Sequence, residues 1–595
     1  MKRKSFFRAL IFFLLVNAGL SVYGETLSSE NAGWTAVLSG KAVCPPCQTS
    51  YGFAVLSDAK MISACTENGK VLWERKVPGH PDPFLTVFSS DFLLSVCGKN
   101  ELSLINPSGL TLWSVKVPFE IKNSPKAGLD CRIFVKGEKN IACYSINGIC
   151  KWILETEDLR EENLMQMNDG SLIALCKAEE NGKTTAVRIS PFGEMLETIT
   201  FSGKILSAGE AVSGLMLYFS DGSAGMCFIK ENKASTKWTI PYSDRAFSNT
   251  IPSYPAEFIE LNAQKAALAA NCSRGTRVLV FNTSDGRVSD FFDVPQKFEE
   301  TILFKSTKNG QNIFLSGRQS AFLYSTSGTE VWKADFPKSG DIFSKWNQII
   351  LTEKTNLVIC STNWAMAGFK ISQNISKKTE QQKFPKKTYE SFLKSDSSSL
   401  AFLDFSETLP ERMTGTDRIQ ILKNGNYGSK EKEYLSGLKD FCRAYREFQM
   451  QKASRPSLVQ KSIFERDYTG VEDAIMQLAE FGTDFFIPDL ASIIRNENNP
   501  ALLTAALRAV SECPFDPDSR ILKNIEIRAK SLPASSDSAF IAICDAVLEI
   551  CRFMGRPALF SYGMDIITVF LNPQYSSGVR DYARQTLSKI ARLKI

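Results

Sequence analysis

The stretch Asn68-Gly69-Lys70-Val71-Leu72-Trp73 decides the fold, because its pattern returns along the chain. A glycine after Asn or Ser is again followed by a tryptophan four positions later at Gly109–Trp113, Gly148–Trp152 and Gly328–Trp332. Each copy comes after an apolar, strand-like run. Glycine permits the φ > 0 turn that reverses the chain between two strands. The pattern therefore predicts a repeated unit of short antiparallel strands.

Degenerate copies extend the repeat. Gly193 is followed by Glu197, Gly286 is followed by Asp290, and Ala234 replaces the glycine before Trp238. Trp34 has no glycine four positions earlier. The successive gaps are 39, 40, 39, 45, 41, 52 and 42 residues, a spacing typical of repeat architectures. The anchor positions are Trp34, Trp73, Trp113, Trp152, Glu197, Trp238, Asp290 and Trp332.

A tryptophan carried once per unit is well suited to fill the gap between neighbouring small sheets. Four short strands per unit, arranged radially, form a β-propeller. We expect Trp34 to complete the last sheet, begun by residues 348–351, 357–361 and 367–371. This closure predicts eight blades. Seven blades are the alternative, because the units around Glu197 and Asp290 are degenerate.

Over residues 30–375 the repeat resembles the PQQ-like (Trp-docking, BamB-like and quinoprotein-like) β-propeller family. The resemblance implies a propeller that is either a quinone-dependent dehydrogenase or a quinone-free scaffold, such as those in outer-membrane β-barrel assembly. The residues that would carry the Trp-docking pattern are Trp34, Gly69, Trp73, Gly109, Trp113, Gly148, Trp152, Trp238, Gly328 and Trp332.

The residues favour the scaffold over the enzyme. The quinone enzymes of the family often use two adjacent cysteines, a carboxylate-bound Ca²⁺ and an Asp base, but this chain has no Cys-Cys pair. His80 is the one histidine, no Gly-x-Ser-x-Gly elbow accompanies it, and multi-histidine metal sites are impossible. Asp516-Pro517-Asp518 fails as a calcium loop because Arg520 occupies its fifth position, so we expect these acids to cap a helix. We therefore predict no catalytic residue, no cofactor and no metal.

The 15 cysteines are read as small apolar residues, because many of them lie within strand-like runs. Cys44-Pro45-Pro46-Cys47 is the exception. Gln48 follows it where c-type haem attachment needs His. A thioredoxin-like role needs a helix after the first cysteine, whereas turn and strand residues follow here. A local disulfide and two reduced thiols remain the alternatives.

The amino terminus predicts export. Residues 1–24 combine a basic start, an apolar run at 9–16 and small residues before a cut after Gly24, as a signal peptide does. We expect a periplasmic or extracellular protein, soluble or peripherally membrane-associated, with no transmembrane segment after cleavage. Without these residues the balance is 66 Lys+Arg to 64 Asp+Glu, which argues against nucleic-acid binding.

The carboxy-terminal third changes character. Residues 376–428 are polar and partly basic and predict a linker or exposed arm, and residues 429–595 predict an all-α domain. The segments at 482–510 and 577–587 resemble HEAT-type helical repeats, with a plain helical bundle as the alternative. Asn499 before Pro500 is a strong helix start.

Together these features predict a multidomain β + α protein that acts as a non-catalytic, exported scaffold or adaptor. Its protein partners would bind propeller and helical-repeat surfaces, in envelope or outer-membrane protein assembly. The alternatives are a quinoprotein-type dehydrogenase, a hydrolase that uses carboxylates in the central channel, and a propeller that binds a small ligand or glycan.

Overall fold

The computed structural model describes residues 25–371, residues 472 and 475–476, and residues 483–593. Within the first range it leaves out 129–130, 168, 178–182, 212–213, 231–232, 241–255, 273–274, 296–302, 308–309 and 354–355. The predicted signal segment, the predicted linker at 376–428 and the amphipathic stretch at 430–450 lie outside the described residues.

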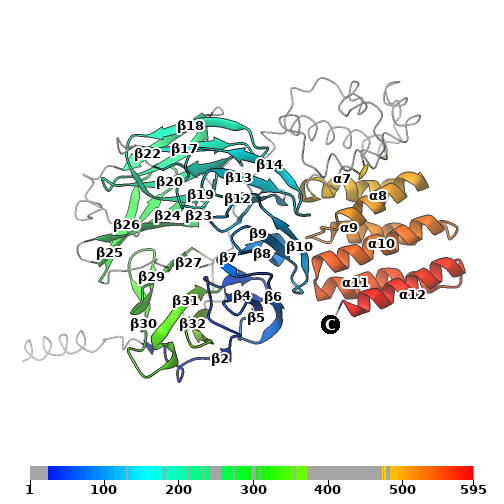
Figure 1. Ribbon diagram of the computed structural model, residues 1–595, viewed down its shortest axis with the longest axis horizontal. Helices are drawn as coiled ribbons and strands as arrows, with labels where there is room; N and C mark the ends of the chain where they lie inside the picture. Colours follow the sequence, from blue (N-terminus) through cyan, green and yellow to red (C-terminus); the bar gives the residue numbers. More distant parts are fainter. Residues whose placement is uncertain are drawn as a thin grey trace, which may run out of the picture.

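Eight antiparallel sheets form the blades of a β-propeller, so the eight-bladed prediction is confirmed (Figure 1). Blade 1 consists of β3 (Cys47–Thr49), β4 (Gly52–Ser57), β5 (Met61–Thr66) and β6 (Val71–Lys76), and blade 2 consists of β7 (Pro81–Phe88), β8 (Phe92–Cys97), β9 (Glu101–Ile105) and β10 (Thr111–Lys116). Blade 3 consists of β11 (Lys126–Ala127), β12 (Ile133–Lys136), β13 (Asn140–Tyr144) and β14 (Cys150–Glu155), and blade 4 consists of β15 (Met165–Gln166), β16 (Leu172–Leu175), β17 (Thr184–Ile189) and β18 (Met195–Phe201).

Blades 5 to 8 continue the same order along the chain. Blade 5 consists of β19 (Ile205–Ala211), β20 (Gly214–Phe219), β21 (Ala224–Lys230) and β22 (Lys233–Ile240), and blade 6 consists of β23 (Ala256–Asn262), β24 (Lys265–Cys272), β25 (Gly275–Asn282) and β26 (Val288–Val294). Blade 7 consists of β27 (Leu303–Ser306), β28 (Asn312–Ser316), β29 (Ser320–Ser325), β30 (Glu330–Asp335) and the added β1 (Glu25–Thr26). Blade 8 consists of β31 (Trp346–Leu351), β32 (Asn356–Ser361), β33 (Ala365–Lys370) and β2 (Trp34–Val37).

The first strand of each blade lies innermost. Strands β19, β23, β27 and β31 contact one another from blade to blade, as only strands around the central axis can. The second strands are wholly buried, as in β4, whereas the last strands are largely exposed, as in β6. Burial on both faces explains why the middle strands read as continuous apolar runs in the sequence.

The ring closes with strands from both ends of the propeller. Strand β2 pairs antiparallel with β33, with Trp34 opposite Gly368, as the sequence predicts. Just before it, β1 pairs in parallel with β30 of blade 7. The junction of blades 8 and 1 is a buried cluster that includes Phe53, Val55 and Val358. Closure of this kind leaves only short protected edges.

The described carboxy-terminal region is helical. Asn499 accepts a hydrogen bond from Ala501 N through its side chain and so caps α8, with Pro500 in the first helical turn. Among the described helices none is long and apolar enough to cross a membrane. The elements are α7 (Thr483–Asn496), α8 (Pro500–Glu512), α9 (Arg520–Ser531), α10 (Asp537–Met554), α11 (Pro557–Thr568), η6 (Val569–Leu571) and α12 (Ser577–Arg592).

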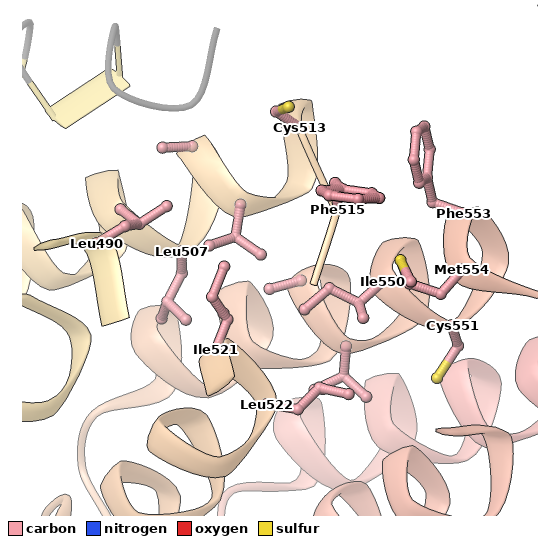
Figure 2. Close-up of a cluster of buried hydrophobic side chains, with 14 of the residues drawn as sticks. Leu490, Leu507, Cys513, Phe515, Ile521, Leu522, Ile550, Cys551, Phe553 and Met554 are labelled. Atoms are coloured by element: carbon pink, nitrogen blue, oxygen red, sulfur yellow. The ribbon is translucent and has the colours of Figure 1, made fainter. Parts of the chain in front are cut away.

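The helical region packs against blade 2 of the propeller (Figure 1). Phe92, at the start of β8, lies 5.9 Å from the ring of Phe515 and 5.5 Å from that of Phe553, centroid to centroid. Figure 2 shows Phe515 and Phe553 above the helical core that includes Leu522 and Ile550. One continuous apolar cluster thus joins the helices to blades 2 and 3.

Candidate interaction surface

Five of the docking tryptophans each lie against the glycine turn of the next blade. A Cβ added to Gly109 would stand 2.7 Å from the ring of Trp73, and one added to Gly148 would stand 2.7 Å from that of Trp113. Both glycines have positive φ, 81° and 78°, so the turn needs glycine for its backbone and for the ring above it. The same arrangement pairs Trp34 with Gly69, Trp152 with Gly193 and Trp238 with Gly286.

The indole N–H groups fix the docking geometry. Trp73 donates its Nε1 hydrogen to Pro107 O at 2.7 Å, and Trp113 donates to Ile146 O at 2.7 Å. Trp152 and Trp238 donate in the same way to Pro191 O and Thr283 O at 3.1 Å. A half-buried indole thus fills the gap between two sheets while its polar end is satisfied. Trp332 is buried in the cluster between blades 7 and 8.

Two blades replace the tryptophan. In blade 4, Glu197 accepts hydrogen bonds from Ala234 N of blade 5 and from Arg188, both at 2.8 Å. In blade 6, Asp290 occupies the predicted position in the register, opposite Val280, but the ring that meets Gly328 belongs to Phe292, two residues further on. The anchor of this unit is therefore Phe292 and not Asp290, because side chains two apart share one face of a strand.

The two residues weighed above as candidates for chemistry, His80 and Asp516, lie apart. His80 is in the loop between β6 and β7, where its Nδ1 is 3.1 Å from Pro81 O. Asp516 accepts hydrogen bonds from Ile521 N and Leu522 N at 3.1 and 2.9 Å, as a cap of α9 does. Among the described residues no group of three or more His, Cys, Asp or Glu side chains could hold a metal ion.

Charged side chains on the innermost strands form contacts across the propeller centre. Lys126 of blade 3 pairs with Glu210 of blade 5 at 2.7 Å, and Glu210 also accepts from Gln166 N of blade 4. Glu257 of blade 6 lies on the next innermost strand. Burial raises the pKa of the Glu257 carboxyl to about 7, because desolvation disfavours its charged form.

The Glu257 carboxyl makes stability fall as pH rises. Its pKa in the folded chain lies above the ordinary 4.5, so the folded state binds the proton more tightly than the unfolded state does. The stability that this proton contributes is complete below pH 4.5 and is lost as the pH rises to 7. We expect Glu257→Gln to match the wild type below that window and to gain about 1–3 kcal/mol above it. Denaturant unfolding at pH 4 and pH 8 measures the difference. Glu155→Gln, at an exposed position of β14, is the control; an equal gain at both pH values would contradict the prediction.

A cleft between α9 and α11 has a volume of about 170 Å³. Its polar groups satisfy one another, since Tyr562 donates to Glu526 at 2.5 Å and Lys530 pairs with Glu526 at 2.6 Å. Ligand pockets usually measure roughly 300–1,000 Å³ and direct polar groups inward. The cleft therefore has the character of a packed helical surface and not of a small-molecule site.

An exposed apolar patch lies at the end of blade 8, which we name the blade 8 patch: Val37, Ile342 and Trp364. Their side chains are 80%, 38% and 56% exposed. Trp364, in the turn between β32 and β33, has a φ of 62°, which is uncommon for a bulky residue. Leu38 N donates to Trp364 O and Ser361 Oγ donates to Ile342 O, which holds the three segments together.

The sequence did not point to the blade 8 patch. Trp364 lacks the glycine four positions earlier, so the repeat did not select it. Val37 comes to lie beside it only because strand β2 joins a sheet that is over 300 residues away in the sequence. The patch lies at the end of its blade that carries the β32–β33 turn. The helices pack against the turns at the other end of blade 2, after β7 and after β9. The two surfaces therefore belong to opposite faces of the ring.

Comparison with known proteins adds only a general likeness of fold. No protein-family model matches the chain, and no curated protein matches it. BamB from Moraxella catarrhalis and Sqt1 from Saccharomyces cerevisiae are each 12% identical over 57% of this chain and 99% of theirs, with TM-scores of 0.41. The WD40 propeller domain of Doa1 is 8% identical, with a TM-score of 0.34, over 57% of this chain and 97% of its own. Likenesses at these scores carry no argument about binding.

Proposed function

We propose that this chain is a non-catalytic, exported scaffold that binds a protein partner through the blade 8 patch. The exposed Trp364 carries this proposal. A tryptophan held at positive φ is a strained and solvated arrangement, and such outliers gather at functional positions. Exposed apolar residues grouped on one surface mark interaction sites, and tryptophan is enriched among the residues that dominate binding energy.

Further observations support a scaffold. The glycine turns and docked rings support a Trp-docking repeat of the PQQ-like kind, and the packed helices support a second, HEAT-like surface. The signal-like residues 1–24 support export, and the resemblance of the repeat supports a role in envelope or outer-membrane protein assembly. A propeller whose blades share buried apolar clusters is a rigid frame on which surface residues can hold partners.

The test compares partner capture by matched variants of the full chain. Photo-crosslinking from position 342 in the native envelope should give a discrete adduct, and Trp364→Asp should reduce its yield about tenfold or more, as loss of a dominant contact does. Leu72→Asp, at a 47% exposed position on the outer strand of blade 1, is the control and should leave the yield unchanged. Equal yields from both variants, with unchanged melting temperatures, would overturn the proposal.

A further inference from the structure

Cys44 and Cys47 converge on one residue of the neighbouring blade. Cys47 Sγ donates a hydrogen bond to Leu85 O at 2.9 Å. The thiol of Cys44 also lies within hydrogen-bonding reach of the Leu85 backbone. Both cysteines belong to the same buried cluster between blades 1 and 2. The two sulfurs thus lie on the same side of β7, beside the backbone of Leu85, and both are free thiols.

The two thiols differ in exposure and in the charges near them, and these differences indicate which thiol reacts first with an external reagent. Cys44 is 3% exposed, whereas Cys47 is half-buried. Lys305, on the innermost strand of blade 7, lies close enough to Cys47 to stabilise its thiolate. Cys44 also lies close enough to Cys360 of blade 8 to act on its thiol, and Cys360 is completely buried. Cys47 is therefore the thiol that an external reagent can reach.

We propose that Cys44 and Cys47 are a dithiol site that a disulfide-bearing oxidant closes to an intramolecular disulfide. The Cys47 thiolate attacks one sulfur of the oxidant's disulfide, whose other sulfur leaves as a thiolate and takes a proton from solvent. The Cys44 thiolate then attacks Cys47 Sγ and releases the second half of the oxidant in the same way. Two protein thiols lose two electrons and two protons, and one disulfide is reduced to two thiols.

The two cysteines can be oxidised to a disulfide, but they lack the features by which redox enzymes catalyse disulfide exchange in other proteins. Redox enzymes with this spacing place the first cysteine at a helix amino terminus, which lowers its pKa. Here β3 begins at Cys47, and burial raises the pKa of Cys44 to about 12 and that of Cys47 to about 11, the latter opposed by Lys305. Both thiols are thus mostly protonated at neutral pH, and exchange is slow.

The closed disulfide would tie the closing strand to blade 1. The connector from β2 to β3 is held to blade 8 through Asn347, which donates to Ala42 O at 2.5 Å, and to blade 1 through Val43 N, which donates to Leu56 O. A bond from Cys44 to Cys47 would anchor the end of this connector to the first strand of blade 1. This inference does not depend on the proposed scaffold function.

Peptide mapping of the full chain after exposure to oxidised glutathione tests the site. Trypsin cuts after Lys41 and Lys60 and releases residues 42–60, which contain no cysteine besides these two. The native protein should yield this peptide resistant to alkylation until it is reduced. A peptide alkylated twice without reduction, or a disulfide from Cys44 to Cys360, would overturn the proposal.

Variants test the order of attack. Cys44→Ser should trap a glutathione adduct on Cys47, whereas Cys47→Ser should leave Cys44 unmodified. The oxidation rate of the wild type should rise about tenfold per pH unit from pH 7 to 9, since the thiolate fraction does. Lys305→Met should slow it about threefold to tenfold, and Lys338→Met, at an exposed position in the connector after β30, should not. An adduct on Cys44 in Cys47→Ser, or equal rates in the two lysine variants, would contradict the assignment.

Discussion

Replacing Trp73 with alanine is expected to lower the free energy of unfolding by about 3 kcal/mol. The ring fills the space between blades 1 and 2, and no side chain can move into that space because the facing residue is Gly109. The substitution also leaves Pro107 O without the indole donor 2.7 Å away. Loss of a packed, half-buried aromatic ring and loss of a hydrogen bond act in the same direction. Denaturant unfolding followed by far-ultraviolet circular dichroism measures the change.

Trp364→Ala is the matched control for Trp73→Ala. Both remove a tryptophan from the propeller, but Trp364 is 56% exposed and is not docked on a glycine turn. We expect its removal to change the unfolding free energy by about 0.5 kcal/mol or less, as surface substitutions do. Equal losses in the two variants would contradict the view that a tryptophan stabilises the ring by docking between two blades.

The propeller could be predicted because its signal is local and repeated. Gly69 and Trp73, four residues apart, already specify a turn and the strand that follows it, and four full copies with three degenerate ones establish a period. The closing strand was predictable for the same reason, since Trp34 is an anchor without its own glycine turn. The prediction was imprecise where a unit departs from the pattern, at Asp290, because Phe292 on the same strand face could take over the docking role.

Contacts between distant segments were not predictable from these patterns. Phe92 is one of many phenylalanines in apolar runs, and only its position beside Phe515 and Phe553 distinguishes it. In the sequence, Glu197 only marks a repeat unit that lacks its tryptophan. In the structure, its carboxylate accepts a hydrogen bond from the backbone of the next blade. Convergence of Cys44 and Cys47 on Leu85 requires two blades to be in place. Such features depend on three-dimensional neighbours that no single stretch of sequence encodes.

Replacing Asn106 with aspartate is expected to detach the helical region from the propeller. Asn106 is completely buried, and its Nδ2 donates to Arg552 O at 2.9 Å and Phe553 O at 3.3 Å, two carbonyls in the last turn of α10. Its Oδ1 accepts from Ser108 and Leu110 within its own turn. Aspartate has the same shape and keeps the second set of bonds. It places a carboxylate oxygen against two carbonyls at the negative end of a helix, where anions are disfavoured.

The expected loss for Asn106→Asp is about 3 kcal/mol at pH 7, because a buried charge without a donor costs more than a lost neutral bond. Only the protonated carboxyl can donate to the α10 carbonyls, so its pKa in the folded chain should lie above the unfolded value. The variant should therefore regain stability as pH falls toward 4, and lose it as pH rises. Denaturant unfolding at both pH values, with limited proteolysis to follow the helices, measures this. Asn68→Asp, exposed in the corresponding turn of blade 1, should change little at either pH. A pH-independent loss would show that Asn106 does not hold α10 through these donor bonds.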